Sequence, residues 1–269
     1  MSSCCLKGFK WDGAPTGREA SINGQDCYVA GSNPDVAIIV IHDLYGWTFP
    51  NVRLLADHYA AEVGATVYVP DLCVPSLPLP PLPRNDLLTS NSFGGVVLPP
   101  AIIDNPPEWD KLDLPTFMAR NSKQARAPEM AALARFLRTQ HHRLGAIGFC
   151  YGGWAVFQLG ARVAEGEVPL VDCISTAHPT FLEEEEMLRV GVPVQILAPE
   201  RDPKFTEELK TFAVKEIPKL GVAFDYQYFP GLDHGFAVRG NRKDEAETRG
   251  LERAMRAAVG WFREWLVEA

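Results

Sequence analysis

Short runs of apolar, β-prone residues alternate with helix-like segments along most of this 269-residue chain. Such runs place apolar side chains on both faces of a strand, which is typical of parallel strands covered by helices on both sides. Strands that alternate with helices also favour right-handed βαβ connections. We therefore predict one α/β domain over residues 1–269, with a mainly parallel central sheet and helices on both of its faces. The expected strands are residues 37–42, 66–72, 144–149, 171–176, 192–198 and 223–230, and the expected helices are residues 50–63, 122–140, 153–165, 205–217 and 244–267.

A proline-rich segment interrupts this alternation. Residues 73–117 contain PSLPLPPLPRN and LPPAIIDNPP and show no clear periodicity. A loop of this length inside a compact domain is commonly a lid or part of a pocket wall. Its apolar residues, such as Trp109 and Phe117, argue against a fully disordered linker. We predict a pocket wall or lid here, with a meandering surface loop as the alternative.

The formal net charge of −8 narrows the choice of partners. Nucleic acids and anionic membranes bind clustered Lys and Arg, so neither is expected to bind this chain. An anionic small molecule would need a local arginine. No stretch reaches the roughly 18 apolar residues of a membrane span, and the N-terminus lacks the apolar run of a signal peptide. We therefore expect a cytoplasmic protein.

None of the six cysteines belongs to a CxxC pair or to a Cys/His cluster with zinc spacing. In a reducing cytosol they are expected to be reduced thiols, and the ordinary role of such a residue is that of a small buried hydrophobe. The cysteines are Cys4, Cys5, Cys27, Cys73, Cys150 and Cys173.

The motif GFCYGG at residues 148–153 sets Cys150 apart. It follows a strand-like run and precedes a helix-like run, which is the strand–turn–helix context of a G-x-nucleophile-x-G elbow. Cysteine stands where serine is usual, and a thiolate at a helix N-terminus is stabilised by the helix dipole. The alternative is a glycine-rich turn that carries a buried cysteine. We predict that Cys150 is a nucleophile.

An acid and a histidine follow Cys150 in the order that such an elbow requires. Asp202 comes just after the predicted strand 192–198, and His234 comes just after the strand 223–230. Glu200 competes with Asp202, whereas Asp233 is a poor orienting group because adjacent side chains point apart. We predict a triad of Cys150, His234 and Asp202. An oxyanion hole would use backbone N–H groups, and those of Tyr151 and Leu44 are the expected donors.

These pieces resemble the dienelactone hydrolase family, especially its carboxymethylenebutenolidase homologues. The matching stretches are IVIHDLYGWTFPNVRLLAD, VYVPDL, IGFCYGG, APERDP and GLDHGF, which together span roughly residues 25–267. The resemblance implies a single-domain α/β-hydrolase fold. It also implies a small-molecule substrate, namely a lactone or activated ester opened by a Cys–His–Asp triad, with no metal and no organic cofactor.

The resemblance implies further site residues. Asp43 occupies the place of a carboxylate that contacts the resting thiol, although Asp in a turn could equally position Leu44. Arg239 and Arg120 are the expected ligands of a substrate carboxylate, with an exposed arginine as the alternative for Arg239. A specialised secondary-metabolite hydrolase or cyclase and a non-catalytic binding module on the same fold are the alternative functions. We expect a monomer or a homodimer.

Overall fold

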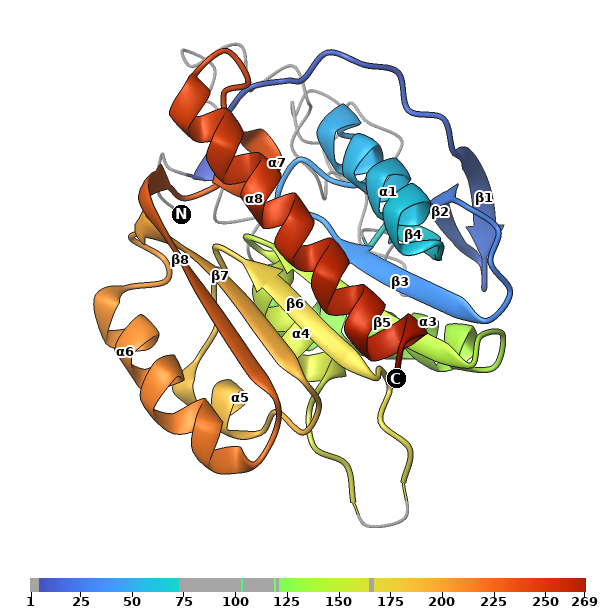
Figure 1. Ribbon diagram of the computed structural model, residues 1–269. Coiled ribbons are helices and arrows are strands. Elements are labelled where there is room, and N and C mark those ends of the chain that lie inside the picture. The colour runs from blue at the N-terminus through green and yellow to red at the C-terminus, as the bar shows by residue number, and fades with distance from the viewer. Residues whose placement is uncertain (1–4, 73–102, 104–118, 120, 165–166) are drawn as a thin grey trace.

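The structure is a computed structural model that describes residues 5–72, 103, 119, 121–164 and 167–269. Within these residues, eight strands form one sheet in the order β1-β2-β4-β3-β5-β6-β7-β8 (Figure 1). Strands β3 to β8 pair in parallel, and β2 pairs antiparallel with β1 and β4. The strands are β1 (Arg18–Ile22), β2 (Gln25–Ala30), β3 (Val36–Ile41), β4 (Thr66–Pro70), β5 (Arg143–Phe149), β6 (Cys173–Ala177), β7 (Val194–Arg201) and β8 (Phe224–Asp233).

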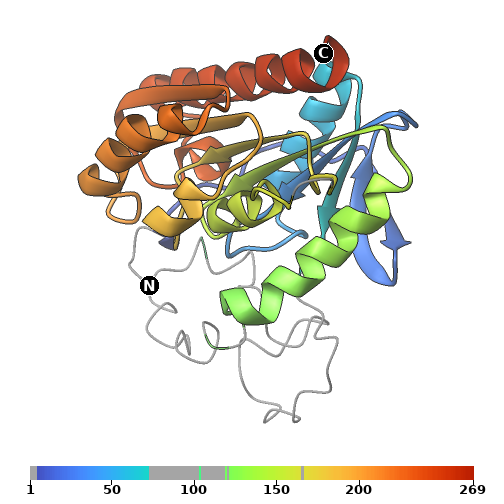
Figure 2. The ribbon, with the colours of Figure 1, turned by 90° about the horizontal axis from the view of Figure 1, so that it is seen from below.

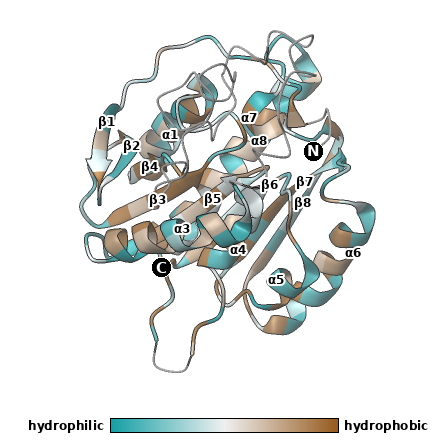
Figure 3. Cartoon of the chain, turned by 180° about the vertical axis from the view of Figure 1, so that it is seen from behind, coloured by the Kyte–Doolittle hydropathy of each residue, from teal (hydrophilic) through white to brown (hydrophobic). Residues whose placement is uncertain are grey.

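Helices cover both faces of this sheet, as the sequence pattern predicts. Helices α1 and α8 lie on one face, and α3 and α4 lie on the other, which is seen most clearly from below (Figure 2). Figure 3 shows largely hydrophobic central strands behind helices that carry both hydrophilic and hydrophobic residues. The helices are α1 (Pro50–Val63), α3 (Lys123–Arg138), α4 (Gly152–Leu159), α5 (Glu184–Leu188), α6 (Glu207–Glu216), α7 (Phe236–Arg239) and α8 (Glu245–Phe262), with short turns η4 (Ile217–Leu220) and η5 (Arg263–Val267).

The β1–β2 hairpin was not predicted, although its turn carries a strong local signal. Asn23 and Gly24 both have positive φ, at 51° and 78°, and the strands pair Ile22 with Gln25 directly across the turn. Two consecutive positive φ values suit a type I′ turn, for which Asn-Gly is the preferred pair. The hairpin adds the antiparallel edge to an otherwise parallel sheet.

The helix expected over residues 153–165 is wrong in its second half, because α4 ends at Leu159. Gly160 packs so closely on its neighbours that a Cβ atom there would lie 3.0 Å from Ile174 and 2.9 Å from Val192. The next residue, Ala161, forms an antiparallel bridge with Val190. Tertiary packing therefore draws the chain out of the helix sooner than its periodicity suggests.

The predicted pocket wall or lid over residues 73–117 lies outside the described residues, apart from the buried Ile103. Among the helices that the structure describes, none is both long enough and apolar enough to cross a membrane. The carboxyl ends of β3, β5, β7 and β8 meet at one edge of the sheet, which brings the loops after these strands together. Sites of parallel α/β sheets form at this edge.

Candidate active site

Cys150 stands in the sharp turn between β5 and α4, where its φ is 51°. A positive φ is uncommon for a residue with a Cβ atom and costs about 1–3 kcal/mol. The turn has no room for side chains at its glycines. A Cβ atom added at Gly148 would lie 2.1 Å from the carbonyl oxygen of Gly152, and one added at Gly152 would lie 2.2 Å from that of Ile41. The sequence motif GFCYGG therefore folds into the strained strand–turn–helix geometry that its glycines predict.

Asp202 and His234 form a buried pair beside this turn. The imidazole Nδ1 lies 2.9 Å from Oδ1 and 3.0 Å from Oδ2 of the carboxylate, and neither side chain is exposed. Because a carboxylate only accepts hydrogen bonds, Nδ1 carries the proton and Nε2 points the other way. The carboxylate is itself held by the N–H groups of Lys204 and Phe205, at 2.8 Å and 3.1 Å. The ring of His234 is thus fixed in one orientation.

Glu200 and Asp233, the other two acids considered as partners of His234, make contacts elsewhere. Glu200 accepts a 2.5 Å hydrogen bond from the N–H of Gly231. Asp233 forms an exposed ion pair with Arg201. Of the three acids near the ends of β7 and β8, Asp202 is the one that the structure brings to His234.

The His234 environment favours the charged imidazolium. Burial has the largest single effect and would lower the pKa of His234, but the hydrogen bonds to Asp202 and Cys5 and the charge of Asp202 together outweigh it, and the pKa rises to about 9. His234 is therefore cationic at neutral pH. A cation next to a thiol stabilises the thiolate, so this arrangement can activate a neighbouring sulfur.

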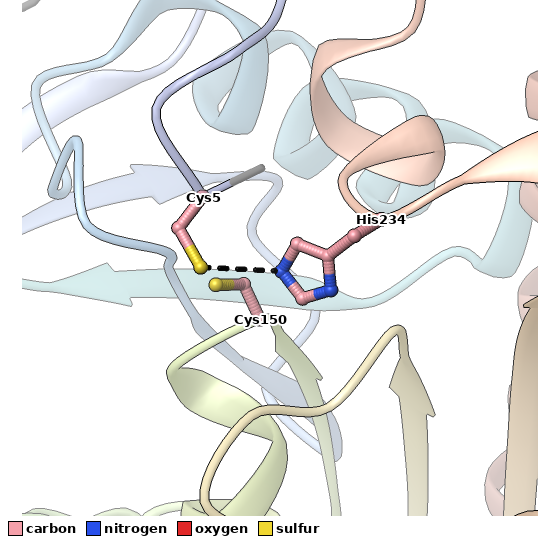
Figure 4. A group of neighbouring side chains, drawn as sticks. All are labelled: Cys5, Cys150 and His234. Atoms are coloured by element: carbon pink, nitrogen blue, oxygen red, sulfur yellow. Dashed lines mark hydrogen bonds between the residues drawn. The ribbon is translucent and has the colours of Figure 1, made fainter. Parts of the chain in front are cut away.

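The sulfur of Cys150 contacts a hydroxyl group on one side, and on the other lie Cys5 and His234, which Figure 4 shows. A 3.4 Å hydrogen bond joins it to Oγ1 of Thr180. It also lies within 4.8 Å of Nε2 of His234, and within 4.8 Å of the sulfur of Cys5. The Cys5 sulfur in turn lies 3.9 Å from Nε2 of His234. Both Cys5 and Thr180 were missed by sequence reasoning.

The two predicted oxyanion donors lie in the loops that follow β3 and β5. Leu44 lies in the loop after β3 and is buried, and Tyr151 follows the cysteine at the start of α4. Within the described part of the chain, no hydrogen-bond acceptor faces the N–H of Leu44. An N–H group that is buried and not yet bound can donate to an oxyanion.

Asp43 and Arg239 pair with each other in the interior. Oδ2 of Asp43 lies 2.7 Å from Nε of Arg239, and the two side chains are 1% and 0% exposed. The other carboxylate oxygen accepts from the N–H of Tyr45 at 2.9 Å, and the guanidinium donates to the carbonyl oxygen of Cys5 at 2.8 Å. The carboxylate of Asp43 therefore contacts the turn after β3 and the guanidinium of Arg239. The thiol of Cys150 contacts Thr180 instead. Arg120 lies outside the described residues.

A cavity of about 550 Å³ opens beside the Asp202–His234 pair. Its walls include Phe9 and Gly8 of the N-terminal segment, together with Arg239. Cys150 is fully buried and is not among the described residues that line it. The cavity therefore reaches the histidine from the side of α7.

Residues 26–266 match the dienelactone hydrolase family. Hydrolase tropI of Talaromyces stipitatus is 26% identical over 99% of this chain and 97% of its own length. The human carboxymethylenebutenolidase homologue is 27% identical over 97% of this chain and 96% of its own length. A putative dienelactone hydrolase from Klebsiella pneumoniae shares the fold, with a TM-score of 0.63 at 16% identity over 96% of this chain and all of the other. The chain therefore belongs to the dienelactone hydrolase family and is a hydrolase of the ester or lactone type.

Proposed function

We propose that the chain opens lactones or activated esters of the dienelactone type through a triad of Cys150, His234 and Asp202. The observation that carries the proposal is the buried Asp202–His234 pair, whose Nε2 faces the strained cysteine turn. The order of the three residues along the chain and the match to the dienelactone hydrolase family support it. Acyl transfer by such a triad needs the nucleophile next to the histidine, and the Cys150 sulfur lies within 4.8 Å of His234.

The proposed reaction begins with the thiolate of Cys150, which the His234 imidazolium stabilises. The sulfur attacks the substrate carbonyl, and the N–H groups of Leu44 and Tyr151 hold the resulting oxyanion. The C–O bond of the ester or lactone then breaks, and the departing oxygen takes the proton from Nε2 of His234. A thioester with Cys150 remains.

Water completes the cycle. Neutral His234 removes a proton from a water molecule, which attacks the thioester carbonyl and releases the carboxylic acid and the thiolate. Asp202 holds the imidazole in the correct tautomer throughout and stabilises the imidazolium. Protein residues carry every step of this reaction.

The test is hydrolysis of p-nitrophenyl acetate by the wild type and by Cys150→Ala. We expect the variant to lose turnover while its melting temperature stays close to that of the wild type. Cys173→Ala, which removes another buried cysteine from β6, is the matched control and should remain active. Mass spectrometry of the wild type during turnover should find one acetyl group on Cys150. Full activity of a folded Cys150→Ala protein would reject the triad. A folded wild type without activity would favour the binding-module alternative.

The substrate is expected to carry a carboxylate. We propose that Arg239 binds this carboxylate and that Arg120 is a second ligand. Arg239 borders the cavity, yet its guanidinium already pairs with Asp43. In Arg239→Lys, a direct role predicts a larger rise in KM for a carboxylate-bearing lactone than for a neutral ester. Equal changes for both substrates would leave Arg239 a purely structural role.

The alternative of a specialised secondary-metabolite hydrolase or cyclase differs in substrate rather than in site. Its test is a panel of small lactones and aromatic esters, in which a cyclase would form a ring instead of releasing an acid. We propose a monomer or homodimer in the cytoplasm, to be measured by light scattering and by localisation of a tagged chain.

A further inference from the structure

A second thiol lies at the proposed active site and has no part in the proposed reaction. The sulfurs of Cys5 and Cys150 and Nε2 of His234 all lie within 4.8 Å of one another. Figure 4 shows the three side chains pointing toward one another. Cys5 is 1% exposed, Cys150 is fully buried, and His234 is 5% exposed. Neither cysteine forms a disulfide within the described part of the chain. Two sulfurs and an imidazole nitrogen that converge in the interior form the ligand set of a soft divalent metal ion.

Hydrogen bonds at Cys5 and at the residues that follow it fix the backbone of this segment. Nη1 of Arg239 donates to the carbonyl oxygen of Cys5 at 2.8 Å, and the hydroxyl of Tyr45 donates to that of Leu6 at 2.6 Å. Four residues further on, the N–H of Phe9 donates to the carbonyl oxygen of Arg239 at 2.9 Å. The side-chain amide of Asn51 donates to the oxygen of Phe9 at 2.8 Å. These bonds fix the N-terminal segment against α1 and α7, so the Cys5 sulfur is held where it is.

The distances fit a tetrahedral metal ion after small movements. Zinc–sulfur bonds of about 2.3 Å and a zinc–nitrogen bond of about 2.0 Å place two sulfurs about 3.8 Å apart and a sulfur about 3.5 Å from the nitrogen. The Cys5 sulfur lies 3.9 Å from Nε2 of His234, a few tenths of an ångström from the ideal. The other two separations are each within 4.8 Å. The two sulfurs need to approach by at most about 1 Å, and the Cys150 sulfur and Nε2 of His234 by at most about 1.3 Å, which a change in a cysteine χ1 angle can supply.

The orientation and charge of the site also fit. Asp202 holds Nδ1 of His234, which leaves Nε2 directed at the sulfurs, and metal-binding histidines commonly have such a carboxylate behind them. Two thiolates neutralise a divalent ion, so the occupied site adds no net charge to the interior. The nearby Asp43–Arg239 pair is already neutral as a unit. Burial of the ion is therefore compatible with its surroundings.

We propose that Cys5, Cys150 and His234 bind one Zn²⁺ ion, with the fourth coordination position open to water, and that this ion inhibits the enzyme. Binding forms two Zn–S bonds and one Zn–N bond, and two protons leave: one from the thiol of Cys5 and one from Nε2 of the His234 imidazolium, which pairs with the Cys150 thiolate before the ion binds. The ion occupies the sulfur and nitrogen lone pairs that hydrolysis needs. The inhibitory half of the proposal rests on the proposed function of Cys150, whereas the binding half stands on geometry alone.

The test uses the full-length protein in metal-free buffer with a phosphine reductant, which keeps the thiols reduced, and Co²⁺ as an optical probe for Zn²⁺. We expect one ion per chain, with near-ultraviolet bands from thiolate ligands and visible bands of a tetrahedral ion, and we expect Zn²⁺ to displace it. Cys5→Ser should weaken binding at least ~100-fold, because even the loss of a second-shell partner costs 10–100-fold. Cys27→Ser, in which a buried cysteine of β2 is changed, is the matched control and should bind as the wild type does.

Cys150→Ala provides a second variant, in which Cys5 and His234 remain and the thiolate band should fall to about half at saturating Co²⁺. Zinc inhibition of p-nitrophenyl acetate hydrolysis should need far more Zn²⁺ in Cys5→Ser, with each variant compared with its own uninhibited rate. Binding that is unchanged by Cys5→Ser, or a Co²⁺ spectrum without thiolate bands, would overturn the proposal. If Cys150 were not the nucleophile, Co²⁺ would still bind but would not inhibit, which separates failure of the metal site from failure of the proposed function.

Discussion

Asp43→Asn removes a charge from the interior while it keeps nearly the same shape. Asn retains an oxygen that can accept from the N–H of Tyr45, the 2.9 Å bond that Asp43 makes in the turn after β3. What it removes is the negative partner of Arg239, 2.7 Å away, in a pair whose side chains are 0% and 1% exposed. The guanidinium remains charged in the variant, because an arginine side chain does not lose its proton in proteins.

The expected cost follows from this burial. Removal of one partner from a buried ion pair typically costs about 3–5 kcal/mol, because the other charge is left uncompensated. Arg239 keeps its hydrogen bonds to the carbonyl oxygens of Cys5 and Lys7, so we expect the lower end, about 3 kcal/mol. For a chain of this size, at roughly 2–4 °C per kcal/mol, the melting temperature should fall by about 6–12 °C.

Urea unfolding and calorimetry measure this loss directly. A double-mutant cycle with Arg239→Gln isolates the pair, and the double variant should be clearly more stable than the sum of the single changes predicts. A loss below about 1 kcal/mol in Asp43→Asn, or additive single effects, would refute the argument.

The same variant tests the other role considered for Asp43. A carboxylate in contact with the thiol would oppose thiolate formation, so its removal would speed alkylation of Cys150 by iodoacetamide. The observed contacts of Asp43 instead predict a loss of stability with little change in alkylation, measured well below the melting temperature.

Asp202→Asn should lower kcat for p-nitrophenyl acetate by about 10⁴-fold, because the amide no longer holds the His234 tautomer, and a folded variant with near-normal kcat would contradict the triad. Gly153→Ala should destabilise the protein in thermal melts, because its Cβ atom would lie 2.3 Å from Cβ of Pro179, whereas Gly260→Ala in the open face of α8 should stabilise it by up to about 1 kcal/mol. Burial, and then neighbouring positive charges, hold the pKa of His178 in the folded protein well below 6.5. Below pH 6.5 the unfolded chain therefore binds a proton at His178 that the folded protein does not bind, so the contribution of His178 to the free energy of unfolding is constant above pH 6.5 and decreases as the pH falls below it. Between pH 7.5 and 5.5 the free energy of unfolding, measured by thermal melts, should decrease more steeply in the wild type than in His178→Phe, by up to about 1.4 kcal/mol per pH unit. Equal slopes would show that His178 does not take up a proton on unfolding.

The local part of this protein could be predicted from its sequence. Apolar runs marked all six parallel strands, and Pro50 marked the first residue of α1. The glycines around Cys150 indicated a tight turn, because only residues without a Cβ atom allow that approach of backbone to backbone. Asp202 and His234 were identified because each follows its own strand, and the ends of parallel strands share one edge. The Asn23-Gly24 turn carried an equally local signal that went unused.

Contacts between distant segments were decided by the tertiary structure. The pairing of Asp43 with Arg239 joins the loop after β3 to α7, and it depends on how the crossovers stack these elements. Cys5 and His234 are 229 residues apart in sequence, and the spacing of the cysteines predicted no metal site. Periodicity and turn chemistry act over a few residues, whereas the place of an N-terminal thiol depends on bonds from Arg239, Tyr45 and Asn51 that exist only once the sheet has formed.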